Sequence, residues 1–264
     1  LLGDPTFDAF VGADRPSPEL RTAMIDDVLD SFAFHLARDD SFADWFTSPY
    51  SFAKGDELAA LYGSAKWDGK DGEPPRFPAG ERSGLLTRAA LLSTGTARTR
   101  PIMKGVFVRD RILCDSVPPP PANATTIPAG LTSKMSTREV VETLTQQPKS
   151  TCASCHSTLI NPLGFATENY DALGRIRSKE VLYSAEGKEL GATAVETHSV
   201  PRIWQNDNQA SSGAGDLTAQ ILDSGKAEAC FARQYIRFAY GRREVDQVDG
   251  LSLIHISEPT RRRG

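Results

Sequence analysis

Three side chains able to bind a haem group lie together in the stretch Cys152-Ala153-Ser154-Cys155-His156. Each cysteine thiol can add across a haem vinyl group, and the adjacent histidine can reach the iron as its proximal ligand. The spacing C-x-x-C-H is the attachment motif of c-type haem. With 4 Cys and 4 His in 264 residues, chance would produce it in about one of a thousand such chains. We therefore predict one covalent haem c on Cys152 and Cys155, with His156 on the iron.

Two other kinds of site use the same residue types. A zinc site would need a second pair of ligands at close spacing, and the remaining cysteines, Cys114 and Cys230, are isolated and distant from the motif. A redox-active dithiol usually lies at the strand-to-helix turn of a βαβ unit, and no such pattern flanks this motif. The haem interpretation is therefore favoured over both.

Residues after the motif indicate how the haem would be held. In c-type cytochromes the carbonyl oxygen of a proline that follows the proximal histidine can accept a hydrogen bond from the histidine Nδ1, which fixes the ring. Pro162 is placed for this role. Arg175 or Arg177 could pair with a haem propionate, because a guanidinium group matches a carboxylate bidentately. Either arginine could equally be a solvated surface residue.

The sixth ligand of the iron decides between electron transfer and catalysis. No methionine follows the motif. Met135, in a loop before a capped helix, is the candidate ligand, His198 is a second one, and Met103 is assigned to the core. If no side chain binds, an open iron could bind peroxide, oxygen or nitric oxide, and the nearest polar residues in the sequence are Asn169 and Tyr170.

Cys114 and Cys230 form an even pair outside the motif. Haem is attached to such motifs outside the cytoplasm, and disulfides persist in oxidising compartments. We therefore expect a Cys114–Cys230 disulfide that ties the haem-bearing region to the C-terminal helix, with two buried free thiols as the alternative. The same reasoning predicts a periplasmic or otherwise extracytoplasmic location.

Composition narrows the classes of partner. The chain is 39% hydrophobic and 24% charged, with a net charge of −4. No basic face with interleaved aromatic residues is visible, so nucleic acid is not expected. No apolar run approaches the roughly 20 residues of a membrane span. The chain starts at Leu1 without a signal peptide, and we expect an internal fragment or a mature form. A redox protein of unknown identity is the expected partner.

Helical periodicity dominates the chain, so the predicted fold class is mainly α, with long loops. Ser17-Pro18-Glu19 is a helix start, and Ser136 to Glu139 is a capping box. Helices are expected over 17–38, 41–46, 52–62, 85–92, 98–113, 136–147, 165–170, 217–222 and 227–240. The last of them carries Phe231, Tyr235 and Phe238 on one face. One short β-hairpin is expected around a turn at Glu186-Gly187.

Several strings, taken in order, resemble a known family. They are Gly84 to Thr87, Lys104 to Val108, Ile112 to Cys114 with its trailing prolines, the haem motif, Asn161 to Ala166, Glu168 to Asp171, and Gly174-Arg175. Together they resemble the large cytochrome c proteins of planctomycetes and myxobacteria, which are built from consecutive domains of unknown function. The resemblance covers roughly Leu58 to Glu244. It implies an exported haem protein and names no substrate.

The same resemblance suggests how the chain is divided. Residues 1–64 would be the C-terminal part of a preceding helical domain. Residues 65–178 would be an irregular, cytochrome-c-like, haem-binding domain, and 179–250 a C-terminal helical domain. Residues 251–264 are expected to be foreign, because Leu251 to Arg261 is what a transposon-based sequencing adaptor encodes when it is read in frame.

Three functions are compatible with these features. The expected one is electron transfer through the single haem to or from a partner protein. The alternative is a haem enzyme, peroxidase-like or oxidase-like, with an open sixth coordination site. A third is a non-redox structural role, in which the haem or the four prolines Pro118 to Pro121 serve assembly.

Overall fold

The computed structural model describes residues 16–70, 72–95, 98–119, 132–184 and 187–243. The first part of the chain forms helices α1 (Pro18–Ala37), α2 (Phe42–Phe46) and α3 (Asp56–Tyr62). The middle forms a 3-10 turn η2 (Leu85–Thr87), helices α4 (Ala89–Leu92) and α5 (Pro101–Phe107), a π-helical turn η3 (Val108–Ile112) and helix α6 (Thr137–Thr145).

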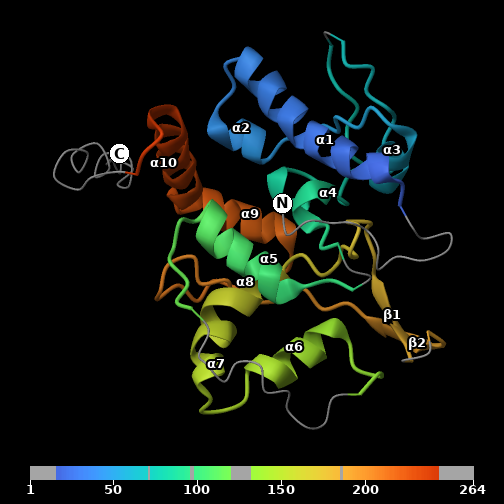
Figure 1. The fold of residues 1–264 in the computed structure, drawn as a ribbon, viewed down its shortest axis with the longest axis vertical. Helices are drawn as coiled ribbons and strands as arrows, with labels where there is room; N and C mark the ends of the chain where they lie inside the picture. The colour runs from blue at the N-terminus through green and yellow to red at the C-terminus, as the bar shows by residue number, and fades with distance from the viewer. Residues whose placement is uncertain (1–15, 71, 96–97, 120–131, 185–186, 244–264) are drawn as a thin grey trace.

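The motif region and the C-terminal part complete the fold. The motif region forms helix α7 (Thr151–Cys155), a π-helical turn η4 (His156–Ile160) and helix α8 (Asn161–Phe165). The rest forms strands β1 (Lys179–Tyr183) and β2 (Glu189–Ala194) and helices α9 (Ala214–Asp223) and α10 (Lys226–Tyr240). In Figure 1, α1 to α4 occupy the upper part, α5 and α9 the middle, and α6 to α8 the lower part. The predicted class, mainly α with a short hairpin, is confirmed for the described residues.

Local capping signals placed two helices correctly. The Ser17 hydroxyl accepts a hydrogen bond from the Leu20 amide at 3.2 Å and begins α1. At α6, the Ser136 hydroxyl accepts from the Glu139 amide at 3.2 Å, and the Glu139 carboxylate accepts from the Ser136 amide at 2.7 Å. These two hydrogen bonds satisfy amides that would otherwise have no partner at a helix start.

The predicted helix over 165–170 is wrong, because tertiary packing overrides the local pattern there. Helix α8 ends at Phe165, and Tyr170 pairs with Ile176 in an antiparallel bridge. The Tyr170 side chain is buried, and its hydroxyl donates to the Glu81 carbonyl oxygen at 2.6 Å. The predicted helix over 85–92 is also interrupted, at Arg88, whose backbone is extended.

Arg88 is fully buried and holds the upper part of the molecule together. Its guanidinium group contacts both carboxylate oxygens of Asp27 at 2.8 and 2.9 Å, and it donates to the Ser31 hydroxyl at 2.9 Å. The Tyr62 hydroxyl donates to the same Asp27 carboxylate at 2.9 Å. These contacts offset much of the cost of desolvating the buried charge pair, although the buried Arg88 Nε has no hydrogen-bond partner.

Two apolar clusters combine residues from distant parts of the sequence. One joins α1, α3 and α4 with Ala172 and Leu173. The other joins α2, η2, η3 and α8 with α9 and the start of α10. The segments assigned from the sequence to three successive domains therefore share cores within the described residues.

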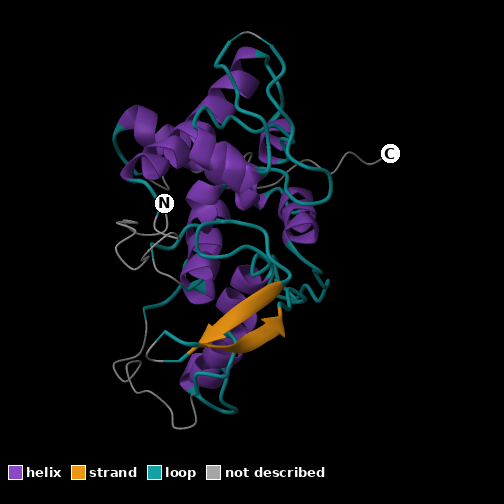
Figure 2. Cartoon of the chain, turned by 90° about the vertical axis from the view of Figure 1, so that its right-hand side faces the viewer, coloured by secondary structure: helices purple, strands orange, loops and turns teal. Residues whose placement is uncertain are grey.

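The C-terminal region contributes a hairpin and a cross-linked helix. Strands β1 and β2 pair antiparallel, with Lys179 opposite Ala194 (Figure 2). Helix α10 packs on η3 but leaves Tyr235 and Phe238 exposed, so the face predicted for α10 is only partly covered. No helix among the described residues is long and apolar enough to cross a membrane.

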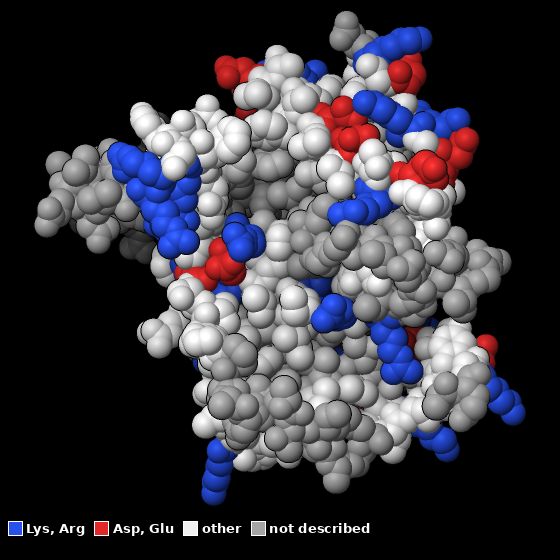
Figure 3. Space-filling model, viewed as in Figure 1, with Lys and Arg blue, Asp and Glu red and all other residues white. Residues whose placement is uncertain are grey.

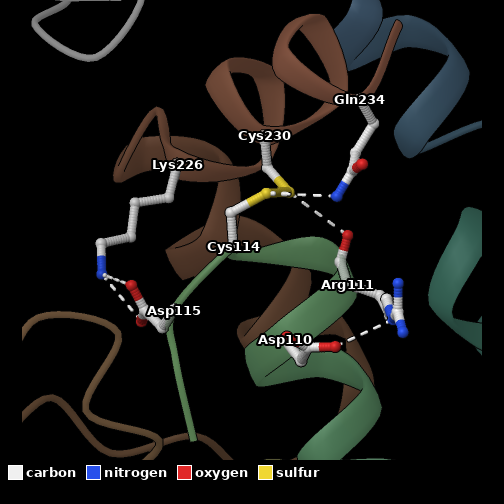
Figure 4. The surroundings of a disulfide bond; sticks show 7 residues. All are labelled: Asp110, Arg111, Cys114, Asp115, Lys226, Cys230 and Gln234. Carbon is white, nitrogen blue, oxygen red and sulfur yellow. Dashed lines mark hydrogen bonds and ion pairs between the residues drawn. A yellow bond between two sulfur atoms is a disulfide. The ribbon is translucent and has the colours of Figure 1, made fainter. Parts of the chain in front are cut away.

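The predicted disulfide joins Cys114, just after η3, to Cys230 on α10 (Figure 4). Their Cα atoms are 5.4 Å apart, and the sequence separation is 116 residues. Beside it, the Lys226 ammonium group contacts both carboxylate oxygens of Asp115 at 2.8 and 2.9 Å. The expected link between the middle of the chain and the C-terminal helix is thus confirmed.

Candidate haem-attachment site

The motif cysteines lie on the short helix α7. The Ser150 hydroxyl accepts from the Ala153 amide at 3.1 Å and begins this helix. Residues three apart in a helix share a face, so Cys152 and Cys155 lie about one turn apart on the same side. Both are free thiols and half-buried. This places two free thiols on one partly accessible helix face.

His156 begins the π-helical turn η4, directly after the second cysteine. Pro162 lies just beyond the turn. Because proline has no N–H, it cannot donate to the Thr158 carbonyl oxygen four residues earlier. A π-helical turn inserted in a helix is frequent at functional sites. Here it widens the helix at the residue whose imidazole would bind the iron.

A chain of hydrogen bonds fixes the His156 ring. Its Nδ1 lies 3.0 Å from Oδ1 of Asn161, a fully buried side chain. The Asn161 Nδ2 donates to the Thr145 hydroxyl at 2.9 Å. That hydroxyl donates to the Val141 carbonyl oxygen at 2.6 Å, within α6. The chain thus runs from the motif into the neighbouring helix.

This arrangement selects one tautomer of His156. The Thr145 hydroxyl hydrogen is used on the Val141 carbonyl, so the hydroxyl must accept from Asn161, which leaves Oδ1 of Asn161 as the acceptor toward the ring. His156 Nδ1 must therefore carry a proton, and in the neutral ring Nε2 carries the lone pair. An Nε2 lone pair is what an iron ligand requires.

The partner of His156 differs from the one predicted. The sequence assigned the Nδ1 hydrogen bond to the carbonyl oxygen of Pro162. In the structure that oxygen accepts from the Ser199 hydroxyl at 2.8 Å. Pro162 therefore joins the motif region to the segment before α9, while the preceding residue, Asn161, orients the ring. Asn161 directly follows the π-helical turn η4 that begins at His156.

Helix α5 lies directly against the turn that carries His156, in backbone-to-backbone contact. A Cβ atom at Gly105 would lie 2.0 Å from the Ile160 carbonyl oxygen, and one at Gly164 would lie 2.0 Å from the Pro101 carbonyl oxygen. Only glycine permits this approach on both helices. The position of α5 relative to η4 and α8 is therefore closely determined.

Buried charges hold the same contact at both of its ends. At one end, Lys104 on α5 pairs with Glu168 at 2.7 Å, and the Thr99 hydroxyl donates to the same carboxylate at 2.6 Å. At the other end, the buried Arg109 donates through Nε to the Leu159 carbonyl oxygen at 3.1 Å. Leu159 belongs to η4, so Arg109 satisfies a carbonyl of the π-helical turn.

A hollow of about 320 Å³ opens between the start of α5 and α6. Its apolar wall is made by Ile102, Met103, Val140 and Val141, and two exposed arginines lie at its edge, Arg98 and Arg100. Val141 also ends the hydrogen-bond chain that starts at His156. Cys152, Cys155 and His156 are not among the residues that line this hollow.

The predicted sixth ligands lie in different surroundings. Met135 is half-buried in the turn before α6, and its amide donates to the Thr132 carbonyl oxygen at 3.2 Å. His198 is exposed on the segment after β2. Met103, which the sequence analysis assigned to the core, is 42% exposed, so that assignment is wrong. Met103 instead lines the hollow between α5 and α6.

The other predicted residues have structural contacts. The Arg175 Nε donates to the Asp171 carboxylate at 2.6 Å, and the Arg177 Nε donates to the Glu168 carbonyl oxygen at 3.0 Å. Tyr170 is in the core with its hydroxyl on Glu81, and burial raises its pKa. Arg175, Arg177 and Tyr170 do not line the hollow between α5 and α6.

The residues present fit a covalently bound haem. Two free thiols share a helix face next to a histidine whose Nε2 is available. Within the described ranges, no three His, Cys, Asp or Glu side chains converge as ligands of one metal ion. Cys152, Cys155 and His156 do not form such a group either. Asn161, Thr145 and Gly105 were missed from the sequence, although the string Asn161-Pro162 marks the place.

One comparison with known proteins bears on this region. Residues 82–180 match the model of a family described as PSCyt3, Protein of unknown function (DUF1588). The matched range contains α5 to α8 and the whole motif. No curated protein and no solved structure matches the chain. Residues 82–180 are thus similar to a planctomycete cytochrome-like domain of unknown function.

Proposed function

We propose that this protein carries one covalent haem c and transfers electrons through it to or from a partner protein. The observation that carries the proposal is the fixed tautomer of His156. Its Nδ1 proton is committed to a fully buried Asn161, which leaves the Nε2 lone pair of a residue that directly follows the second free thiol. A histidine held only for packing would not need this particular arrangement beside this particular motif.

Each residue of the site has a separate task. The Cys152 and Cys155 thiols would each add S–H across one haem vinyl group, which forms a thioether and needs no oxidant. His156 Nε2 would bind the iron, and the hydrogen bond at Nδ1 would raise the basicity of the ring. Bound haem iron would carry a single electron by changing between the ferric and ferrous states. Asn161 and Thr145 would keep the ring in place during this change.

The surroundings of the site support an exchange of electrons with another macromolecule. The motif cysteines are half-buried rather than enclosed, so a haem edge could reach the surface. In the lower half of the face in Figure 3, the charged side chains that can be seen are mostly Lys and Arg, and the other described atoms are uncharged. The Cys114–Cys230 disulfide supports an extracytoplasmic location, where haem attachment also takes place.

Expression together with a haem-attachment system tests the proposal. We expect a Soret band that stays with the denatured polypeptide, one haem per chain by mass, and reversible one-electron reduction. The double variant Cys152→Ala, Cys155→Ala should lose the covalent haem, whereas Ser154→Ala, within the same helix, should retain it. Absence of covalent haem in the unaltered protein would refute the proposal. A high-spin ferric spectrum that shifts with cyanide or peroxide would instead support a haem enzyme with an open sixth site.

A further inference from the structure

A second hollow, of about 490 Å³, opens between α10 and the helices α1 and α2. Its walls are mostly aromatic, with Phe32 on α1, Phe42 and Trp45 on α2, and Phe231 and Tyr235 on α10. The ring centroids of Phe231 and Trp45 are 5.5 Å apart, so rings from the two sides are in contact. We call this space the aromatic hollow, and it has room for further apolar side chains.

The outer half of α10 carries the same apolar stripe beyond the aromatic hollow. Successive residues turn by about 100° around an α-helix, so Phe238 lies on the same side of α10 as Phe231 and Tyr235. The start of α10 is anchored through the buried Cys230, whereas Tyr235 and Phe238 are exposed. The aromatic hollow and the stripe therefore form one continuous apolar surface.

The size of this surface is typical of an interaction site. An aromatic side chain has about 150–250 Å² of surface. Phe231, Tyr235 and Phe238 are 37%, 63% and 87% exposed, so together they expose roughly 400 Å². The largest apolar patch on a monomer is about 300–600 Å² and is often functional. A stable interface buries about 800 Å² on each partner, and the walls of the aromatic hollow, with the exposed Leu36, can supply the difference.

The surface is complementary to itself, because it combines a hollow with a projecting aromatic side chain. In a twofold interface the same patch is used on both copies. If the axis crosses α10 at Tyr235, Phe238 of one copy comes level with Ala232 of the other, since each is three residues from Tyr235. Ala232 lines the aromatic hollow. The same axis brings the exposed Glu228 level with the exposed Arg242, since each is seven residues from Tyr235.

We propose that this surface pairs with a second copy of the chain, and that Phe238 of each copy fills the aromatic hollow of the other. A second copy supplies both an aromatic side chain for the hollow and a guanidinium group, on Arg242, for the Glu228 carboxylate. The surface lies in the upper part of the molecule and α7 in the lower part (Figure 1). Pairing therefore leaves the motif region accessible, and it does not depend on the proposed haem.

Sedimentation equilibrium of the full chain measures the pairing. We expect a reversible dimer. Phe238→Asp should raise its dissociation constant by about thirtyfold or more, the loss typical of a residue at the centre of an interface. Because Phe238 is exposed, the circular dichroism and the melting temperature of the monomer should stay unchanged. Leu190→Asp, at an exposed apolar residue of β2, is the matched control and should leave the dissociation constant unchanged.

An exchange of charges tests the register. Glu228→Arg and Arg242→Glu should each weaken the dimer, because each brings like charges together, and the double variant should restore it. A chain that stays monomeric would overturn the proposal and leave the surface to a different partner. A dimer that persists in Phe238→Asp, or a double variant that pairs no more tightly than the single ones, would overturn it as well.

Discussion

Replacement of Gly105 by alanine tests the contact that positions the motif. The added Cβ would lie 2.0 Å from the Ile160 carbonyl oxygen, and real Cβ contacts are not shorter than 3.0 Å, so the backbones must separate by about 1 Å. Overpacking of this kind costs about 1–3 kcal/mol. The obstructing atom belongs to the backbone and cannot rotate away, which favours the upper end. Alanine regains up to about 1 kcal/mol of helix propensity, so we expect a net loss of about 2 kcal/mol.

Urea unfolding followed by circular dichroism, with the disulfide intact, measures this loss. Gly215→Ala in α9 is the control, because a Cβ there meets nothing within 4 Å and should leave stability unchanged or slightly higher. Gly164→Ala strains the same interface from the other helix, so the double variant with Gly105→Ala should lose less than the sum of the single variants, by at least about 0.5 kcal/mol. A Gly105→Ala protein as stable as the original would refute the close backbone contact.

Three further changes probe the motif and its supports. Asn161→Leu keeps the branched shape of the buried side chain but removes both its hydrogen bonds. We expect about 1–3 kcal/mol less stability in urea. With haem bound, we expect a higher reduction potential, because His156 becomes less basic. Replacing both Cys114 and Cys230 by alanine should cost about 2–5 kcal/mol, and the melting temperature should then no longer respond to reductant. Hydrogen bonds from the Ser136 amide and hydroxyl lower the pKa of Glu139. The ionised carboxylate therefore stabilises the fold above its ordinary pKa of 4.5, and this contribution is lost as the pH falls. Between about pH 5 and pH 3, the free energy of unfolding should fall less steeply in Glu139→Gln than in the unaltered protein.

Local signals in the sequence predicted much of the fold. Ser17 and Ser136 each accept the hydrogen bond expected of a helix N-cap, and the corresponding helices begin where the caps place them. The Cys114–Cys230 pair could also be predicted, because it needed only an even count and an oxidising compartment. These features depend on a few neighbouring residues, or on chemistry that does not depend on the fold.

Features that depend on long-range contact could not be predicted in the same way. The hydrogen-bond partner of His156 is Asn161, whose orientation depends on Thr145, 16 residues before Asn161. Met103 was assigned to the core because its neighbours are apolar. Gly105 nevertheless held a usable signal, since a glycine inside a helix often marks a close backbone contact, and Met103 lies nearly opposite it. Tyr170 left its predicted helix because its hydroxyl finds Glu81, 89 residues away.

The segment formed by α5 and η3 connects the motif to the C-terminal helix, and Arg109 is its central residue. Through Nε this buried arginine holds the Leu159 carbonyl of the His156 turn, and through its terminal nitrogens it holds the Pro201 carbonyl oxygen at 3.0 Å and the Asp115 carboxylate at 3.0 Å. Asp115 in turn binds Lys226 at the start of α10, beside the disulfide. The disulfide therefore cross-links the scaffold behind the motif rather than the haem-binding face. Removal of the disulfide should therefore lower global stability. The hydrogen bond from His156 to Asn161 should be retained in the folded state, because its supports lie on α6 and not on α10.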